Sequence, residues 1–197
     1  DEAELFRSGL SRLEKAGFHL QETSMADFGF FRTVHQVVGS VEASSSAGKY
    51  DGVRYGHRAS AVKNWNEMYL KSRAESFGLP VKAYLFQGAY FQFENFDAFE
   101  DACRIRARLV KAAEDLLTRV DAVALPTRRK GHPAEKAGTV SQVYDAFVLT
   151  LAASVTGLPA LQVPGIVTDG RFDSGLQLVG RRLSDPHLLS AGARLWR

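Results

Sequence analysis

The amino-acid sequence predicts an α/β fold in which helices cover a small sheet. Three observations lead to this class: amphipathic stretches with helical periodicity outnumber the candidate strands, the strands are short and apolar, and Gly or Pro borders most of them. Layered α/β folds pack helices against a sheet whose strands are buried. Because few candidate strands are visible, we expect further strands to come from a segment outside this chain.

Several stretches have the apolar periodicity of a helix. The longest, residues 96–117, repeats an apolar side chain every three or four positions. Gly17 is a typical stop for the first helix, and Ser184 is a typical N-cap for the last, with Pro186 in its first turn. The other predicted helices cover residues 3–16, 28–41, 62–69 and 143–155.

Four short segments have the composition of strands. Residues 122–125, 160–163 and 176–179 are apolar, and residues 18–22 alternate apolar and polar side chains. The runs 122–125 and 176–179 are apolar on both faces, so we expect neighbours on both sides of each. Turn-forming and polar residues predict loops at 44–56 and 128–139.

Composition limits the class of protein and its location. No apolar run approaches the roughly 18 residues that a membrane span needs, and the acidic start does not match a signal peptide. The single cysteine, Cys103, excludes an intrachain disulfide, and we interpret it as an inert core thiol. A cytoplasmic location fits these features. Because the chain begins at Asp1 rather than Met, we expect that it was processed, cropped or split from a longer protein.

The net charge of +3 comes from charges that alternate in sign along most of the chain, which is typical of solvated faces. The one compact basic cluster is Arg128, Arg129 and Lys130, with His132 nearby. Such a cluster could contact a phosphate backbone. A polar loop of this kind is more often simply solvated, so we do not expect direct contact with nucleic acid.

No residue pattern in this chain indicates a catalytic, metal or cofactor site. The five histidines lack metal-ligand spacing, and there is no phosphate-binding loop, dinucleotide fingerprint or GxSxG elbow. The serines Ser44, Ser45 and Ser46 superficially resemble a catalytic loop. A nucleophilic serine needs a base placed to take its proton, and the nearby Lys49 does not by its position show such a relay. We therefore interpret these serines as part of a turn.

Several sequence blocks follow one another in the order found in one enzyme family. They are Glu42-Ala43-Ser44-Ser45, Lys49-Tyr50-Asp51-Gly52-Val53-Arg54-Tyr55-Gly56, Ser72-Arg73-Ala74-Glu75-Ser76-Phe77-Gly78 with Val81-Lys82, Val120-Asp121 with Pro126-Thr127, Gly157-Leu158-Pro159-Ala160 with Val163-Pro164, and Gly175-Leu176-Gln177-Leu178-Val179-Gly180. Together these blocks resemble the amidase-signature family. The second block resembles the branch of that family formed by the glutaminase subunits of aspartyl/glutamyl-tRNA amidotransferases. The resemblance covers almost the whole chain. It implies the C-terminal part of the amidase-signature fold, a mixed central sheet covered by helices.

The resemblance also implies where the chemistry lies. The family uses a Ser–cis-Ser–Lys triad, in which the Lys is the ultimate base, the middle Ser relays the proton and the second Ser attacks the amide carbonyl. All three residues precede the blocks matched here, so the resemblance assigns no catalytic residue to this chain. We expect residues 1–197 to be the C-terminal portion of an amidase domain whose partner is a catalytic N-terminal portion. We interpret most matched residues structurally, with Gly52, Gly56 and Asp51 in turns and Gly157 at a helix end.

The resemblance further implies which residues line the substrate pocket. Counting from the matched blocks places His35, Tyr84 and Phe147 where the amidotransferase branch holds its glutamine with Tyr, Arg and Asp. A two-residue shift would bring Asp145 to the third position, and Lys82 could substitute for the Arg at the second. A charged amino acid is best held by charge-assisted pairs. Tyr84 and Phe147 supply no charge, so the implied substrate is an uncharged or aryl amide.

Two alternatives stay open. The complete protein could be the glutaminase subunit of a tRNA-dependent amidotransferase, which is a ligase that passes ammonia to partner subunits. It could instead be a free-standing, non-catalytic binding or assembly module. Whether this chain is an enzyme is therefore open, and its expected partners are the amidase segment, amidotransferase subunits or a second copy of itself.

Overall fold

Helices dominate the computed structural model, which describes residues 2–25, 27–127, 138–164 and 175–195. The α-helices are α1 (Glu2–Lys15), α2 (Phe30–Ser46), α3 (Trp65–Ser76), α4 (Leu79–Phe93), α5 (Phe96–Leu117), α6 (Val140–Phe147), α7 (Leu151–Thr156) and α8 (Asp185–Leu195). The 3-10 helices are η1 (Ala47–Lys49) and η3 (Val148–Thr150), and the strands are β1 (Ala122–Pro126), β2 (Ala160–Val163) and β3 (Leu176–Gly180). The predicted α/β class is confirmed.

The described strands form one sheet with the order β1-β3-β2, and both pairings are antiparallel. In the register, Val179 lies opposite Val123 of β1 and Ala160 of β2. All five residues of β3 are buried, whereas β1 is half-buried. The expectation of neighbours on both sides is therefore confirmed for residues 176–179, and β1 pairs on one side within the described part of the chain.

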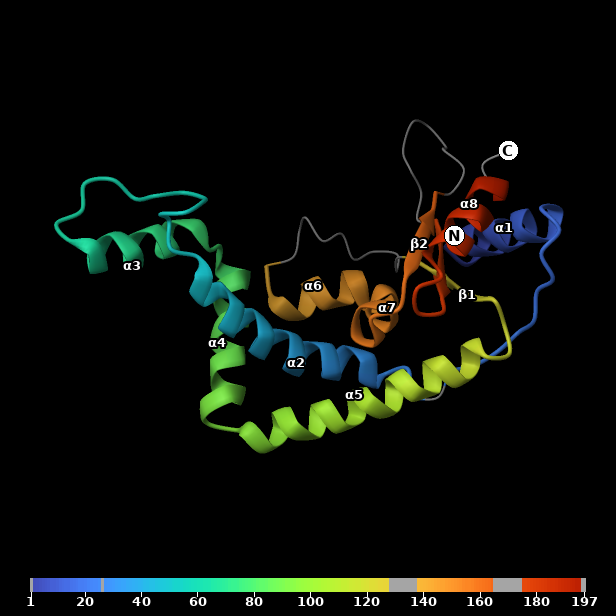
Figure 1. Ribbon diagram of the computed structural model, residues 1–197, viewed down its shortest axis with the longest axis horizontal. Coiled ribbons are helices and arrows are strands. Elements are labelled where there is room, and N and C mark those ends of the chain that lie inside the picture. The colour runs from blue at the N-terminus through green and yellow to red at the C-terminus, as the bar shows by residue number, and fades with distance from the viewer. Residues whose placement is uncertain (1, 26, 128–137, 165–174, 196–197) are drawn as a thin grey trace.

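Helices cover both faces of this sheet (Figure 1). Successive side chains of a strand point to opposite faces. On one face, Leu176 and Leu178 pack with Leu13 of α1 and with α8. On the other face, Val179 packs with Leu117 of α5 and with α7. The sheet is thus the middle layer between α1 and α8 on one side and α5 and α7 on the other.

A second core lies away from the sheet, where α2 packs against α5, α6 and α7. The helix predicted over residues 28–41 is confirmed as α2, and its residues Phe31, Val34 and Val38 are all buried in this core. Leu109 of α5 and Leu151 of α7 complete the contact. Cys103 is half-buried against the same core.

Helices α3 and α4 lie at the end of the molecule opposite the sheet (Figure 1). Helix α4 packs against α2. Its opposite side exposes Leu79, Phe86 and Phe93, each at about three quarters of its surface. These three residues are spaced seven apart and so form one apolar stripe, which we call the α4 stripe.

Several predicted elements differ from the structure. Residues 18–22 form no strand, because Phe18 and Leu20 pack against the sheet core without a paired neighbour. Helix α2 continues through Ser44 to Ser46, so the loop predicted at 44–56 begins later. The helix predicted at 143–155 is divided into α6, η3 and α7.

The last helix begins as predicted, with Pro186 in its first turn. Ser184 directly precedes the helix, as predicted for its N-cap, but its hydroxyl is buried without a hydrogen-bond partner and so forms no side-chain cap. The Ser184 carbonyl accepts from the N–H groups of His187 and Leu188 instead. The basic cluster from Arg128 to Lys130, with His132, lies outside the described residues.

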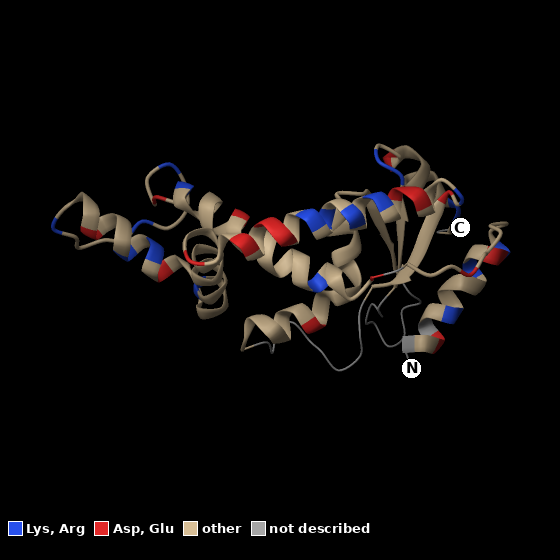
Figure 2. Cartoon of the chain, turned by 90° about the horizontal axis from the view of Figure 1, so that it is seen from below, with Lys and Arg blue, Asp and Glu red and all other residues tan. Residues whose placement is uncertain are grey.

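Acidic and basic residues are interspersed along the chain (Figure 2). Along α5, acidic, basic and again acidic residues follow one another, and Arg104 pairs with Glu100 and Asp101. Within the described part of the chain, no helix combines the length and the apolar character that crossing a membrane requires.

Candidate substrate-binding site

Helices α2 and α4 cross at close range because two glycines at the crossing have no side chain. A Cβ added to Gly88 of α4 would lie 1.9 Å from the Ser40 carbonyl oxygen of α2, so the backbones approach closely there. A Cβ added to Gly39 of α2 would lie 2.5 Å from the Tyr84 hydroxyl oxygen. Each glycine costs its helix about 1 kcal/mol relative to alanine. The crossing brings Tyr84 against α2.

Three polar side chains from three helices meet beside this crossing. His35 of α2 contacts Tyr144 of α6 through a 2.7 Å bond between Nδ1 and the hydroxyl. The hydroxyls of Tyr144 and Tyr84 lie 3.1 Å apart, and the Tyr84 hydroxyl donates to the His35 carbonyl at 3.3 Å. We call this closed set of contacts the triangle. It places two phenols and an imidazole at one partly buried point.

Burial favours the uncharged form of every member of the triangle. Loss of solvent lowers the pKa of His35 below its ordinary value, which favours the neutral imidazole at neutral pH. Burial also raises the pKa of Tyr84 and, more strongly, that of Tyr144, so both phenols keep their protons. The triangle therefore presents polar but neutral groups.

Among the described residues, two charged side chains beside the triangle, Arg32 and Asp145, are paired with each other. Arg32, one turn before His35 on α2, donates to Asp145 at 2.6 Å and to the Ser141 hydroxyl at 2.9 Å. Both Arg32 and Asp145 have side chains that are about 30% exposed (32% and 28%). The Asp145 carboxylate thus holds a cation of this chain, and the Arg32 guanidinium already has its counter-ion.

The structure brings together some of the residues predicted to line the pocket. His35 and Tyr84 meet in the triangle, and Asp145 lies beside it through Arg32. Phe147, at the end of α6, is 40% exposed and takes no part in the three contacts of the triangle. Its role in the pocket stays a prediction.

Sequence reasoning missed two members of this site, Tyr144 and Arg32. Tyr144 lies three residues before Phe147, one helical turn away on the same face. Treating residues 140–147 as one helix would have found it. No local signal identifies Arg32, because its partner Asp145 is more than a hundred residues away.

The turn interpretation of Ser44, Ser45 and Ser46 is wrong, because these serines lie in the last turn of helix α2. Ser40 is fully buried and its hydroxyl donates to the Val37 carbonyl, while the Ser46 hydroxyl donates to the Ala43 carbonyl. Within the described residues, no three His, Cys, Asp or Glu side chains lie close enough to hold a metal ion.

The loop after η1 is fixed by the residues expected to form turns. The Asp51 carboxylate accepts from the backbone N–H groups of Val53 and Arg54, which lowers the pKa of Asp51. Gly52 and Gly56 have φ angles of 68° and 80°, so the turn interpretation of these glycines is confirmed. Gly157 likewise ends α7 with a φ angle of 68°.

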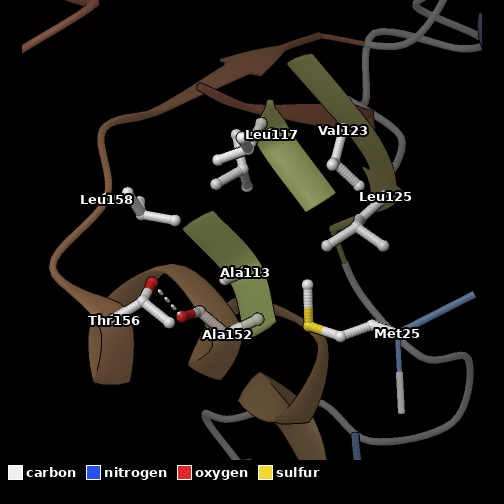
Figure 3. Close-up of a pocket in the computed structure, with 9 residues that line it drawn as sticks. Met25, Ala113, Leu117, Val123, Leu125, Ala152, Thr156 and Leu158 are labelled. Carbon is white, nitrogen blue, oxygen red and sulfur yellow. Dashed lines mark hydrogen bonds between the residues drawn. The ribbon is translucent and has the colours of Figure 1, made fainter. Parts of the chain in front are cut away.

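An apolar hollow lies elsewhere, between α5, α7 and β1 (Figure 3). Its lining includes Met25, Leu117 and Leu158, and the Thr156 hydroxyl beside it donates to the Ala152 carbonyl. Its volume of about 20 Å³ has room for roughly one water molecule. The hollow is thus too small for an amide substrate.

Comparison with known proteins decides the family. The model of the family described as amidase matches residues 1–189, which is nearly the whole chain. The chain belongs to the amidase family. This confirms the family that the ordered sequence blocks indicated.

Curated relatives of this amidase-family chain include the A subunits of two glutamyl-tRNA(Gln) amidotransferases. The protein from Cupriavidus pinatubonensis is 34% identical over 193 residues, which cover 96% of this chain and 38% of the relative. The protein from Neisseria meningitidis is 34% identical over 188 residues, which cover 93% of this chain and 39% of the relative. The chain therefore spans less than half the length of these relatives.

Solved structures of the family share the fold. A crystal structure described as an amidase matches with a TM-score of 0.70 and 23% identity over 98% of this chain and 41% of its own. The A subunit of the glutamyl-tRNA(Gln) amidotransferase from Thermotoga maritima matches with a TM-score of 0.61 and 21% identity, over 95% and 36% respectively. At these identities the likeness concerns the fold alone.

Proposed function

We propose that this chain forms one wall of the substrate pocket of an amide-hydrolysing enzyme that acts on a neutral amide. The observation that carries the proposal is the triangle of His35, Tyr84 and Tyr144, three uncharged polar groups held at one partly buried point. Binding sites commonly combine apolar surface with a few such fixed polar groups.

The neutrality of the substrate follows from the pairing of the nearby charges. A substrate with a carboxylate needs an available cation, and one with an ammonium group needs an available anion. Arg32 and Asp145 already satisfy each other. Binding a charged amino acid at this point would require Arg32 and Asp145 to separate and to give up their 2.6 Å contact.

The proposal assigns the catalytic triad and the pocket wall to different segments of a longer enzyme. The family resemblance puts the Ser–cis-Ser–Lys triad in a segment that precedes the matched blocks. We infer that residues 1–197 act as the C-terminal portion of the amidase domain, in the cytoplasm, with that segment as their partner. The exposed α4 stripe supports this inference, because large apolar surfaces usually mark contacts with another segment or chain.

The test compares this chain with the complete enzyme, by which we mean the chain joined to the triad-bearing segment. We expect the chain alone to release no ammonia from benzamide above buffer, and the complete enzyme to release it with repeated turnover. Changing the exposed Arg104 of α5 to Ala is a matched control that should leave turnover unchanged. Turnover by the chain alone, abolished by changing one of its own serines, would contradict the proposal.

A second candidate function is the glutaminase subunit of a tRNA-dependent amidotransferase, working with partner subunits. The similarity to the A subunits of glutamyl-tRNA(Gln) amidotransferases, at 34% identity, favours this function. It predicts that glutamine is the preferred substrate, so one comparison of substrates separates the two candidates.

A further inference from the structure

The triangle contains a fixed number of protons, and counting them decides how the imidazole of His35 is protonated. A tyrosine hydroxyl has one proton to donate, and a neutral imidazole carries one N–H. The Tyr84 hydroxyl lies 3.3 Å from the His35 carbonyl oxygen, which can only accept, so Tyr84 donates there. In the 3.1 Å contact between the two hydroxyls, Tyr144 must then be the donor.

The third contact completes the count. Tyr144 has given its proton to Tyr84, so in the 2.7 Å contact with His35 the donor must be Nδ1. Protons therefore run in one direction, from His35 Nδ1 to Tyr144, to Tyr84 and back to the His35 carbonyl. Each contact has one donor and one acceptor, and hydrogen bonds arranged head to tail strengthen one another.

The opposite arrangement is worse. If Tyr84 donated to Tyr144 and Tyr144 donated to Nδ1, the Tyr84 oxygen would face the His35 carbonyl oxygen at 3.3 Å with no proton between them. Gly39 makes the observed arrangement accessible, because a Cβ at this position would lie 2.5 Å from the Tyr84 hydroxyl oxygen and displace it.

We propose that the triangle fixes His35 as the Nδ1–H tautomer, so that Nε2 carries a lone pair with which the site recognises an uncharged hydrogen-bond donor on the substrate. The donor is the N–H of a carboxamide or a hydroxyl group. Tyr84 and Tyr144 are then positioning residues that act through His35. The tautomer follows from the geometry alone, whereas the role toward the substrate rests on the proposed function.

The tautomer can be measured directly. Long-range ¹H–¹⁵N correlation spectra of the ¹⁵N-histidine-labelled chain distinguish a protonated ring nitrogen from one with a lone pair. His35→Gln identifies the His35 signals by their loss. At neutral pH we expect His35 to be protonated at Nδ1. A wild-type spectrum with the proton on Nε2, or with rapid exchange between the two nitrogens, would overturn the proposal.

Two independent variants test whether the contacts of the triangle set the tautomer of His35. Tyr84→Phe removes the hydroxyl that receives the Tyr144 proton, so Tyr144 should donate to Nδ1 and His35 should switch to the Nε2–H tautomer. Gly39→Ala should cause the same switch by displacing that hydroxyl, which gives a second route should one variant fold poorly. The matched control is Tyr90→Phe, which removes an exposed hydroxyl from the same helix. A change of the His35 tautomer in Tyr90→Phe, or no change in either folded variant, would contradict this assignment of hydrogen-bond donors.

The role toward the substrate is tested in the complete enzyme. Because Tyr84→Phe turns the acceptor nitrogen into a donor, it should raise KM for benzamide by about tenfold, the loss expected from one hydrogen bond, with little change in kcat. Unchanged KM alongside a switched tautomer would overturn the substrate role and leave the tautomer standing. If the complete enzyme hydrolyses no amide, the proposed function fails while the spectra still decide the tautomer.

Discussion

The guanidinium of Arg32 and the carboxylate of Asp145 lie 2.6 Å apart, and this ion pair joins α2 to α6. The Arg32 guanidinium carbon also lies 5.9 Å from the centroid of the Tyr144 ring. Because Asp145 follows Tyr144 directly on α6, the pair holds Tyr144 in reach of His35. It thus supports the geometry of the triangle and pairs two charges that lie beside it.

We predict that this ion pair contributes measurably to stability. In a double-mutant cycle of Arg32→Ala and Asp145→Ala, we expect a coupling free energy of about 1 kcal/mol, at the upper end for partly exposed pairs. Urea unfolding measures it. The control cycle uses Arg104 and Asp101 on the surface of α5, where the coupling should be about 0.3 kcal/mol. Equal coupling in the two cycles would show that the Arg32 pair has no special role.

The crossing of α2 and α4 should tolerate no side chain at Gly88. Gly88→Ala places its Cβ against the Ser40 carbonyl, which is backbone and cannot move aside. We expect a loss of about 3 kcal/mol in the free energy of unfolding despite the gain in helix propensity. Gly48→Ala is the control, since an added Cβ there meets nothing within 4 Å. Similar unfolding midpoints for the two variants would contradict the close crossing.

The elements that can be predicted from the sequence are those with a clear periodic contrast. Helices α2 and α5 are predictable because apolar and polar residues alternate along them with a helical period. Helix α4 has no such contrast, because apolar residues such as Tyr84 and Phe86 lie on both its buried and its exposed sides. The strand predicted at 18–22 is wrong for the opposite reason, since alternation without a pairing partner does not make a strand.

For the site, counting from the sequence blocks selects His35 and Tyr84, which lie in contact across α2 and α4 in the structure. The sequence predicts neither helix α4 nor this contact. Tyr144 closes the triangle from α6, and Arg32 fixes α6 through Asp145. These contacts join residues far apart in the sequence, so they depend on the tertiary packing. For this reason the sequence alone does not reveal the charge pairing that decides between a neutral and a charged substrate.

Stability should depend on pH through His35. Its folded-state pKa is lowered below 6.5 by burial, so the unfolded chain binds a proton at this residue at a higher pH than the folded chain does. The contribution of the neutral His35 imidazole to the free energy of unfolding is therefore complete above about pH 7. It is lost as the pH falls from about 6.5 through the lowered pKa. Urea unfolding of wild type and His35→Gln over this range measures it. Parallel curves for the two proteins would contradict the buried, neutral imidazole.

The α4 stripe should make the chain alone bind dyes that recognise apolar surface, or associate with itself. Replacing Phe86 and Phe93 together by Ser should reduce both effects without loss of helix content, because the two side chains are about three quarters exposed. Leu189→Ser on α8 is the control for a single exposed apolar residue. A monodisperse wild-type monomer that binds no dye would show that the α4 stripe does not need another segment or chain packed against it.

The preference of the complete enzyme between glutamine and benzamide tests the central claim most directly. With Arg32 and Asp145 paired and the triangle neutral, catalytic efficiency should be higher for benzamide, because glutamine would bring two charges without available partners. Ammonia release at several substrate concentrations gives kcat/KM for each. Higher efficiency with benzamide supports a neutral-amide pocket. A preference for glutamine of about tenfold or more, roughly 1.4 kcal/mol in transition-state binding, would contradict it and favour the glutaminase of an amidotransferase.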